Sequence, residues 1–346
     1  MEQKKKFDLN SFIGFALIFV IVIWMVMDNK SSKTNPKDEK AKTEQNDTKK
    51  NTIVTSSIAE TLKDTTVTDT AKIQKLKAVL GSFAYSASLS SAKDDVTTIE
   101  NEFLILKVAN KGGYVSEVTL KDYKRFDKKS KELVSLIKNN NSNFNLELKT
   151  SDNRILNTKD LYFEPTISKN GDAQILSMKL KAGPNEFLEY KYVLNNKNYM
   201  LDFDIQTQGL AKVLNTSKAS NLEWDLKAYR NEKSISYENR YAEIYFEHKE
   251  GKVDYAGLGA QEDETLEGAT FIAFKQHFFS SILLTKTPIE GASVHSTNLV
   301  HDEDKDTIFT KQFKTIMPLA YKNGELDYKM NFYFGPTDYK ILNSYD

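Results

Sequence analysis

Apolar and polar residues alternate with a period of two along most of the chain beyond about residue 95. Four segments show the alternation most clearly: residues 144–148, 188–192, 199–205 and 328–334. A two-residue period places alternate side chains on opposite faces of a strand, so these segments predict half-buried antiparallel strands. Turn-forming residues separate the strands, and Asn323-Gly324 favours a type I′ hairpin. Many short strands with few helical stretches predict an all-β domain of two packed antiparallel sheets over residues 95–336.

The amino terminus has a different pattern, an unbroken apolar run from Phe12 to Met27. At 1.5 Å per residue the run spans about 24 Å, so a helix over residues 1–28 would cross most of the roughly 30 Å hydrocarbon core. The sequence therefore predicts a transmembrane anchor; its candidate anchor residues are Phe12, Phe15, Phe19 and Trp24, the last near the membrane–water interface. A cleaved signal peptide is the alternative, but residues 27–30 offer no small-x-small cleavage site.

Lysines flank the predicted anchor on both sides. Lys4, Lys5 and Lys6 form a compact group before it, and Lys30 and Lys33 partly offset them after it. The positive-inside rule then favours a cytoplasmic amino terminus and an exported main domain in the periplasm.

Residues 29–94 are predicted to be a flexible linker. The first part of this range has few large apolar residues, and the first aromatic residue within the range is Phe83. A helix is possible at residues 69–80, where Ile73, Leu76 and Leu80 have helical spacing and Gly81 would end it. Such a helix is marginal in isolation and needs a surface on which to dock.

Composition excludes several classes of function. Lys+Arg 48 and Asp+Glu 48 balance to zero net charge, which argues against a nucleic-acid-binding protein. The absence of cysteine excludes thiol nucleophiles, iron–sulfur clusters and disulfides. The four histidines lack metal-ligand spacing, and Asp302-x-Asp304-x-Asp306 has Thr307 where a calcium loop requires glycine. We therefore expect no metal, no cofactor and no enzymatic activity.

Two segments are unusually rich in aromatic residues. Residues 271–284 favour a single central strand, and the alternative is a cleft or a surface that contacts a partner. In residues 332–342 a strand ends at Gly335, and Pro336 suits the first turn of a helix. Residues 337–346 would begin that helix.

Several motifs in a fixed order make the chain similar to a known family: Ile99–Glu102, Asn110–Gly113, Val118–Tyr123, Tyr237–Tyr241, Ala273–Phe279 and Phe334–Tyr339, after the lysine-rich start. The chain resembles the amino-terminal part of YidC membrane protein insertases of Gram-negative type. The resemblance implies a first transmembrane helix and a periplasmic β-supersandwich of the galactose mutarotase-like kind. It also implies location in the bacterial inner membrane and a role in inserting, folding and assembling membrane proteins. The implied partners are nascent membrane proteins, the Sec translocon with its accessory subunits, and the lipid bilayer.

The five further transmembrane helices that carry the family's insertase groove have no counterpart in this sequence. After Met27 no other apolar run approaches the length of a membrane span. We therefore transfer no functional residue from the family. Our hypothesis is that the segment around Pro336, Tyr339 and Ile341 contacts the membrane core of the insertase.

Two alternatives remain open. One is a membrane-anchored periplasmic carbohydrate-binding or mutarotase-like protein, which predicts a catalytic His–Glu pair facing a cleft. The other is a structural tether with no insertase attached.

Overall fold

The computed structural model describes residues 69–345, except residues 127–128, 130 and 250. The described residues all belong to one compact unit. The predicted anchor, with Phe12, Phe15, Phe19 and Trp24, lies outside the described residues, as does the linker up to residue 68. In the part of the chain that the structure describes, no helix is long and apolar enough to cross a bilayer.

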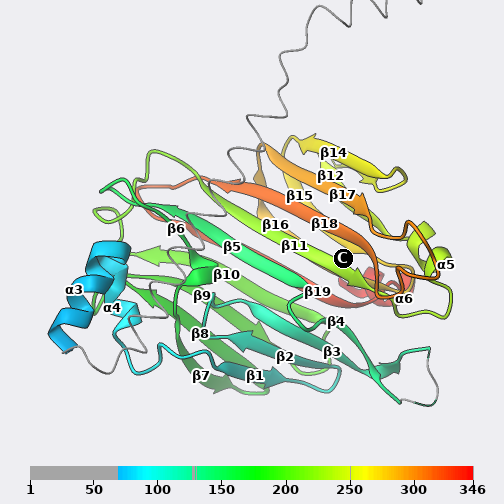
Figure 1. Cartoon of the computed structure of the whole chain (residues 1–346), viewed down its shortest axis with the longest axis horizontal. Coiled ribbons are helices and arrows are strands. Elements are labelled where there is room, and N and C mark those ends of the chain that lie inside the picture. The colour runs from blue at the N-terminus through cyan, green and yellow to red at the C-terminus, as the bar shows by residue number, and fades with distance from the viewer. Residues whose placement is uncertain (1–68, 127–128, 130, 250, 346) are drawn as a thin grey trace, which may run out of the picture. The chain divides into compact units, whose positions relative to one another are not determined.

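The described residues form three antiparallel sheets (Figure 1). The nine-stranded sheet contains, in spatial order, β13 (Lys252–Ala256), β12 (Glu243–His248), β15 (Ala269–Lys275), β16 (Phe279–Ile289), β19 (Asp327–Pro336), β10 (Met200–Gln208), β9 (Phe187–Leu194), β8 (Ala173–Lys181) and β7 (Glu164–Asn170). The six-stranded sheet contains β14 (Gln261–Leu266), β17 (Ala292–Asn298), β18 (Phe309–Leu319), β11 (Ser220–Tyr229), β5 (Ser142–Lys149) and β6 (Ile155–Asn157). The four-stranded sheet contains β1 (Val96–Glu100), β2 (Leu104–Ala109), β3 (Val115–Lys124) and β4 (Leu133–Ile137).

Short helices occur at both ends of this body and between strands. They are α3 (Asp69–Leu80), η1 (Gly81–Phe83), α4 (Ala84–Ala87), η2 (Thr158–Asp160), α5 (Ile235–Arg240), α6 (Tyr339–Leu342) and η3 (Asn343–Tyr345). Figure 1 shows α3 and α4 at one end of the sheets and α5 and α6 at the other.

The segments with two-residue periodicity are the strands β5, β9, β10 and β19, as predicted. Along β10 the side chains of Leu201, Phe203 and Ile205 are completely buried and alternate with partly exposed polar residues. Asn323 and Gly324 have φ values of 52° and 82°, the pair of positive angles that a type I′ turn requires. Local pattern and turn chemistry therefore determine these strands.

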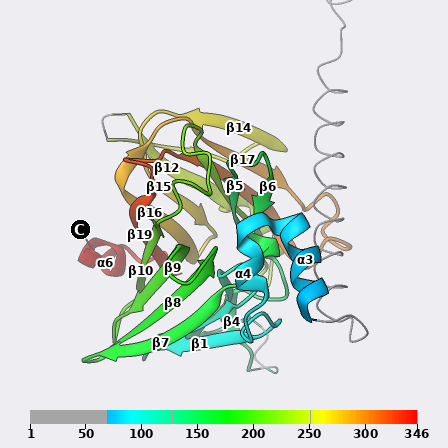
Figure 2. The ribbon, with the colours of Figure 1, turned by 90° about the vertical axis from the view of Figure 1, so that its left-hand side faces the viewer.

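Aromatic side chains fill the space between the two larger sheets. Trp224 of β11 stacks on Phe274 of β15 with ring centroids 4.1 Å apart, and Phe144 of β5 meets Phe203 of β10 edge-on at 5.6 Å. These contacts confirm the predicted pair of packed antiparallel sheets. In Figure 2 the strands β7 to β10 lie on one side of the core, and β1, β4, β5, β6, β17 and β14 on the other.

The four-stranded sheet extends this second layer, an addition that the sequence analysis does not predict. Its end near Gly113 is joined to the nine-stranded sheet, because the hydroxyl of Tyr192 on β9 donates to the Gly113 carbonyl at 2.9 Å. Every strand pair in all three sheets is antiparallel.

Residues 271–284 form two strands and not the single central strand that their apolar pattern favours. β15 ends at Lys275, β16 begins at Phe279, and the two pair as a hairpin. The Gln276 N–H donates to the Phe279 carbonyl at 2.8 Å, and the Gln276 side chain donates to the Tyr229 carbonyl at 2.6 Å. A long-range hydrogen bond thus holds a turn that contains no glycine, proline or asparagine, so local sequence does not reveal it.

Residues 76–94 belong to the folded body, which differs from the predicted linker of residues 29–94. Leu76 and Leu80 of α3 and Phe83 of η1 are buried. The Ser86 hydroxyl donates to the Tyr162 carbonyl at 2.6 Å, which fixes this segment beside η2. The helix at residues 69–80 thus has the docking surface that its marginal propensity requires.

Replacing Phe83 by alanine should lower the free energy of unfolding by about 3–5 kcal/mol, because the ring is fully buried. The matched control is Tyr85→Ala in α4, whose exposed ring should contribute less than about 1 kcal/mol. Urea denaturation of both variants measures the difference. Equal effects would contradict the assignment of this segment to the folded body.

Candidate docking pocket beside the last strand

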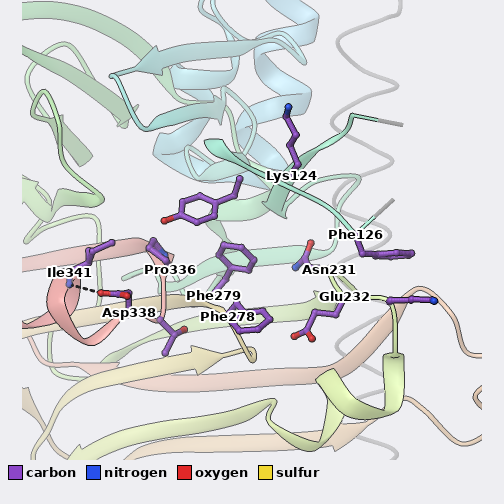
Figure 3. Close-up of a pocket in the computed structure, with 12 residues that line it drawn as sticks. Lys124, Phe126, Asn231, Glu232, Phe278, Phe279, Pro336, Asp338 and Ile341 are labelled. Atoms are coloured by element: carbon purple, nitrogen blue, oxygen red, sulfur yellow. Dashed lines mark hydrogen bonds between the residues drawn. The ribbon is translucent and has the colours of Figure 1, made fainter. Parts of the chain in front are cut away.

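A pocket of about 690 Å³ opens where β3 and β19 end and β16 begins (Figure 3). Its volume lies within the range of roughly 300–1,000 Å³ that small-molecule and side-chain binding sites occupy. Four separate segments contribute its lining: the end of β3, the loop before α5, the β15–β16 turn, and the end of β19 with α6. The lining residues are Tyr123, Lys124, Phe126, Asn231, Glu232, Lys233, Phe278, Phe279, Pro336, Thr337, Asp338 and Ile341.

Strand pairing sets the floor of the pocket. Phe279 at the start of β16 lies opposite Pro336 at the end of β19, and the Thr337 N–H continues the ladder to the Phe278 carbonyl at 2.7 Å. The ring of Tyr123 from β3 meets Phe279 edge-on, with centroids 5.3 Å apart. The floor is therefore an apolar surface held by two strands of the nine-stranded sheet and one of the four-stranded sheet.

The helix α6 begins directly after β19 because of a side-chain cap. The Asp338 carboxylate accepts the N–H groups of Lys340 and Ile341 at 2.9 and 3.2 Å (Figure 3). Further on, the Tyr345 hydroxyl accepts the Tyr199 N–H at 2.9 Å, which returns the chain to the start of β10.

Gly335 allows the end of β19 to pack closely against the rings of Tyr333 and Tyr199. A Cβ at this position would lie 2.7 Å from the Tyr333 hydroxyl oxygen and 3.0 Å from Cγ of Tyr199. Only glycine fits between these two rings without displacing one of them.

The three residues predicted to contact the membrane core lie at this site in different environments. Pro336 is buried and Ile341 is half-buried, and both line the pocket. Tyr339 does not line it, and its side chain is 79% exposed. Their contact with a membrane core stays a prediction.

A buried carboxylate supports the opposite wall. The Glu238 side chain of α5 accepts the N–H of Asn231 at 2.8 Å and that of Glu232 at 3.1 Å, which holds the loop before the helix. Burial raises the pKa of Glu238 to about 7, in spite of these two hydrogen bonds. The neighbouring Asn231 is also buried, lines the pocket, and leaves its Oδ1 without a hydrogen-bond partner in the described part of the chain.

An aromatic group surrounds His277 at the mouth of the pocket. The His277 Nδ1 lies 2.6 Å from Oε1 of Glu232. Its ring stacks on Tyr241 and on Phe278, with centroid distances of 4.6 and 4.0 Å, and Tyr237 meets it edge-on at 5.3 Å. Sequence analysis did not select Glu232, Glu238 or His277 as site residues. The only signal was the presence of Tyr237–Tyr241 and Ala273–Phe279 among the motifs of the family resemblance.

Four of those motifs, far apart in the chain, meet at this end of the body. Val118–Tyr123 contributes Tyr123, and Ala273–Phe279 contributes the turn and the first residue of β16. Phe334–Tyr339 contributes the end of β19 and the cap of α6, and Tyr237–Tyr241 contributes the rings around His277. The motifs therefore mark one surface.

A hydroxyl, an imidazole and a carboxylate elsewhere on the surface are arranged like a hydrolase catalytic triad, but the carboxylate is exposed to solvent. The Thr297 hydroxyl is 2.8 Å from Nε2 of His295, whose Nδ1 bonds the Asp263 carboxylate. The carboxylate is exposed and the imidazole half-buried on the strand pair β14–β17, so water has access to the charges that such a relay must shield. Among residues 69–345 as described, no group of three or more His, Asp or Glu side chains is placed to hold a metal ion.

Comparison with protein families identifies the chain. The family model described as the YidC periplasmic domain matches residues 96–346. The chain belongs to the YidC family. The recognition made from the sequence motifs is thereby confirmed, and the body with its pocket corresponds to the YidC periplasmic domain.

Curated relatives carry the same family name over nearly the whole chain. The membrane protein insertase YidC of Parabacteroides distasonis is 28% identical over 98% of this chain and 53% of its own length. That of Phocaeicola vulgatus is 30% identical over 98% of this chain and 52% of its own length. The chain thus spans about half the length of the curated YidC relatives it matches.

Two solved structures have some likeness to this YidC domain. A galactose mutarotase-related enzyme from Lactobacillus acidophilus is 10% identical, with a TM-score of 0.40 over 71% of this chain and 99% of its own. A putative aldose 1-epimerase from Escherichia coli K12 is 11% identical, with a TM-score of 0.41 over 70% and 99%.

The raised pKa of Glu238 makes a pH dependence of stability testable. Its folded pKa of about 7 exceeds its ordinary value of 4.5, so its contribution to stability is complete below pH 4.5 and is lost as the pH rises to 7. The loss should be on the order of 3 kcal/mol. Glu238→Gln should remove this slope from the variant's own profile of unfolding free energy against pH, so that the difference between wild type and variant changes between pH 4.5 and 7. Denaturation at a series of pH values between 4.5 and 8 measures both profiles.

The control for this measurement is Glu264→Gln on β14, which removes an exposed carboxylate. It should leave the pH profile within experimental error of the wild type. An unchanged slope in Glu238→Gln would show that the buried carboxylate is ionised throughout this range.

Proposed function

We propose that this chain is the amino-terminal part of a membrane protein insertase. Residues 1–28 would anchor it in the bacterial inner membrane with the amino terminus in the cytoplasm, and residues 96–346 would form its domain in the periplasm. One observation supports the proposal: segments on which the family resemblance rests, distant in the sequence, gather around one pocket where α6 leaves β19. A surface assembled in this way favours docking to another part of a larger protein.

The proposed role of this region is mechanical and not enzymatic. Moving a polar segment into hydrocarbon costs several kcal/mol, and a membrane-embedded groove can offset that cost without a nucleotide or metal. The periplasmic body would position such a groove relative to its partners. The partners we propose are nascent membrane proteins and the Sec translocon with its accessory subunits.

The alternative of a mutarotase-like enzyme predicts a His–Glu pair in a cleft, and such a pair stands beside the pocket. However, His277 Nδ1 and Glu232 Oε1 bond each other at 2.6 Å, which leaves no space for a sugar atom between them. Tyr241 and Phe278 also stack on the imidazole. This geometry favours a structural pair. Titration calorimetry with monosaccharides tests the alternative, and measurable heat of binding would support it.

The face that we propose to meet the membrane core includes Pro336, Tyr339 and Ile341. An exposed tyrosine ring next to a pocket gains free energy when a partner covers it, and full burial of such a side chain contributes about 1.5–3 kcal/mol. Tyr339 is the most exposed of the three. It is therefore the residue whose environment should change most on assembly.

Replacing Tyr339 and Ile341 together by glutamate should impair assembly and function of the insertase, because two carboxylates would have to be desolvated at the contact. Complementation of a strain depleted of its native insertase measures function, and the amount of protein in the membrane fraction measures assembly. The control is Ile167→Glu on β7, which is 52% exposed and lies outside the pocket. Complementation by the double variant at the wild-type level would refute this contact.

A further inference from the structure

A group of exposed aromatic rings lies at the pocket, and two of its members line it. We name it the aromatic rim and define it as Phe126, Tyr237, Tyr241 and Phe278. All four side chains are exposed, Phe278 to 55% and Tyr237 to 45%. Tyr237 and Tyr241 lie 5.1 Å apart, and His277 links Tyr241 to Phe278 through stacked contacts. Phe126 lines the same pocket as Phe278.

Three separate segments supply the rim: the residues after β3, the helix α5 and the β15–β16 turn. Phe126 also lies under the guanidinium of Arg230, 4.7 Å from its ring centroid. These contacts hold the rings in place while their outer faces remain in water. A group of exposed aromatic rings of this kind marks an interaction surface.

Near the rim, basic side chains are exposed and unpaired, whereas several carboxylates bond other groups of the body. Four exposed cations without an ion pair in the described part of the chain lie on the segments that line the pocket or carry the rim: Lys124, Lys233, Arg240 and Lys340.

Three carboxylates next to the rim are engaged inside the body, whereas Glu303 and Asp304 are exposed in the loop between β17 and β18 at the same end. Glu232 bonds His277, Glu238 accepts backbone N–H groups, and Asp338 caps α6. The exposed Asp122 on β3 offsets one of the four cations. On the segments that line the pocket or carry the rim, exposed cations therefore outnumber exposed carboxylates, although the whole chain has zero net charge.

We propose that the aromatic rim rests on the surface of an anionic lipid bilayer, with its rings at headgroup level and the four cations facing lipid phosphates. Tyrosine rings favour the membrane–water interface because they combine an apolar body with a polar tip. Basic residues close to an anionic membrane surface are attracted to it electrostatically. An unfolded polypeptide would need only the apolar pocket for binding, so a partner of this kind does not account for the unpaired cations. The inference rests on the proposed function, which places this domain next to a membrane.

Contact through the rim would set how the domain is oriented. Phe126 and Phe278 of the rim line one pocket with Ile341 of α6, so a bilayer that touches the rim also lies close to α6. The opposite end, with α3 and α4, would then point away from the lipid (Figure 1).

The absence of cysteine makes a direct test possible, because a single introduced thiol labels one position only. The full chain with Phe278→Cys or Tyr241→Cys carries an environment-sensitive fluorophore. It is reconstituted into vesicles of phosphatidylglycerol and phosphatidylcholine that contain a nitroxide-labelled headgroup lipid. Both positions should be quenched at least about twofold more than Ile167→Cys on β7, a position about as exposed as Phe278 and more exposed than Tyr241.

The outcomes separate this inference from the proposed function. A chain that floats with the vesicles but is quenched equally at all three positions overturns the bilayer contact and leaves the anchor intact. A chain that stays out of the vesicles overturns both. Shielding of the position-278 fluorophore only when an unfolded apolar peptide is added, without lipid quenching, overturns the contact in favour of a polypeptide partner.

Charge reversal tests the electrostatic part. Lys124→Glu combined with Lys233→Glu should abolish the excess quenching in phosphatidylglycerol vesicles over pure phosphatidylcholine vesicles. Lys169→Glu on β7, also exposed, is the matched control and should leave the excess unchanged. An excess that survives the double reversal overturns the role of the cations.

Discussion

The antiparallel register between β16 and β19 is the constraint on which the pocket depends. It places Phe279 opposite Pro336 and so brings the β15–β16 turn beside the start of α6. Side chains alternate between faces, so a slip of one residue would move Phe332 and Phe334 of β19 out of the core. The aromatic packing between the two larger sheets therefore fixes the register, and the register fixes the site.

Some elements of the fold can be predicted from the local sequence and others cannot. β5, β9, β10 and β19 are readable because each has one face in the core and the other in a more polar environment, which imposes a period of two. The turn at Asn323-Gly324 is readable because few residues adopt positive φ at both positions. The β15–β16 turn could not be predicted from local sequence, because a hydrogen bond from the Gln276 side chain to the distant Tyr229 carbonyl holds it. Docking of residues 76–94 was missed for the same reason, as the surface under Phe83 is built by residues far along the chain.

The pocket itself illustrates what local sequence leaves out. Pro336 and Ile341 could be selected because a strand that ends at glycine with a proline after it is a recognisable boundary before a helix. The prediction placed Pro336 in the first turn of that helix, whereas Pro336 ends β19 and α6 begins at Tyr339. Glu238 could not be selected, because its chemistry comes from burial and from the N–H groups of Asn231 and Glu232, which only the fold supplies. The four lysine and arginine side chains near the rim are unremarkable in sequence. They outnumber the exposed carboxylates on their segments only because neighbouring carboxylates are engaged inside the body.

The position of β19 has a mechanical consequence. It is the middle strand of the nine-stranded sheet, hydrogen-bonded to β16 on one side and β10 on the other, and the chain passes from it directly into α6. A pull applied at α6 along the strand would therefore load two ladders in shear, with many hydrogen bonds sharing the force at once. The Tyr345 hydroxyl, bonded to Tyr199 at the start of β10, passes part of that load to a second strand. Such a strand would transmit tension into the body as a rigid unit, where an edge strand would peel away one bond at a time.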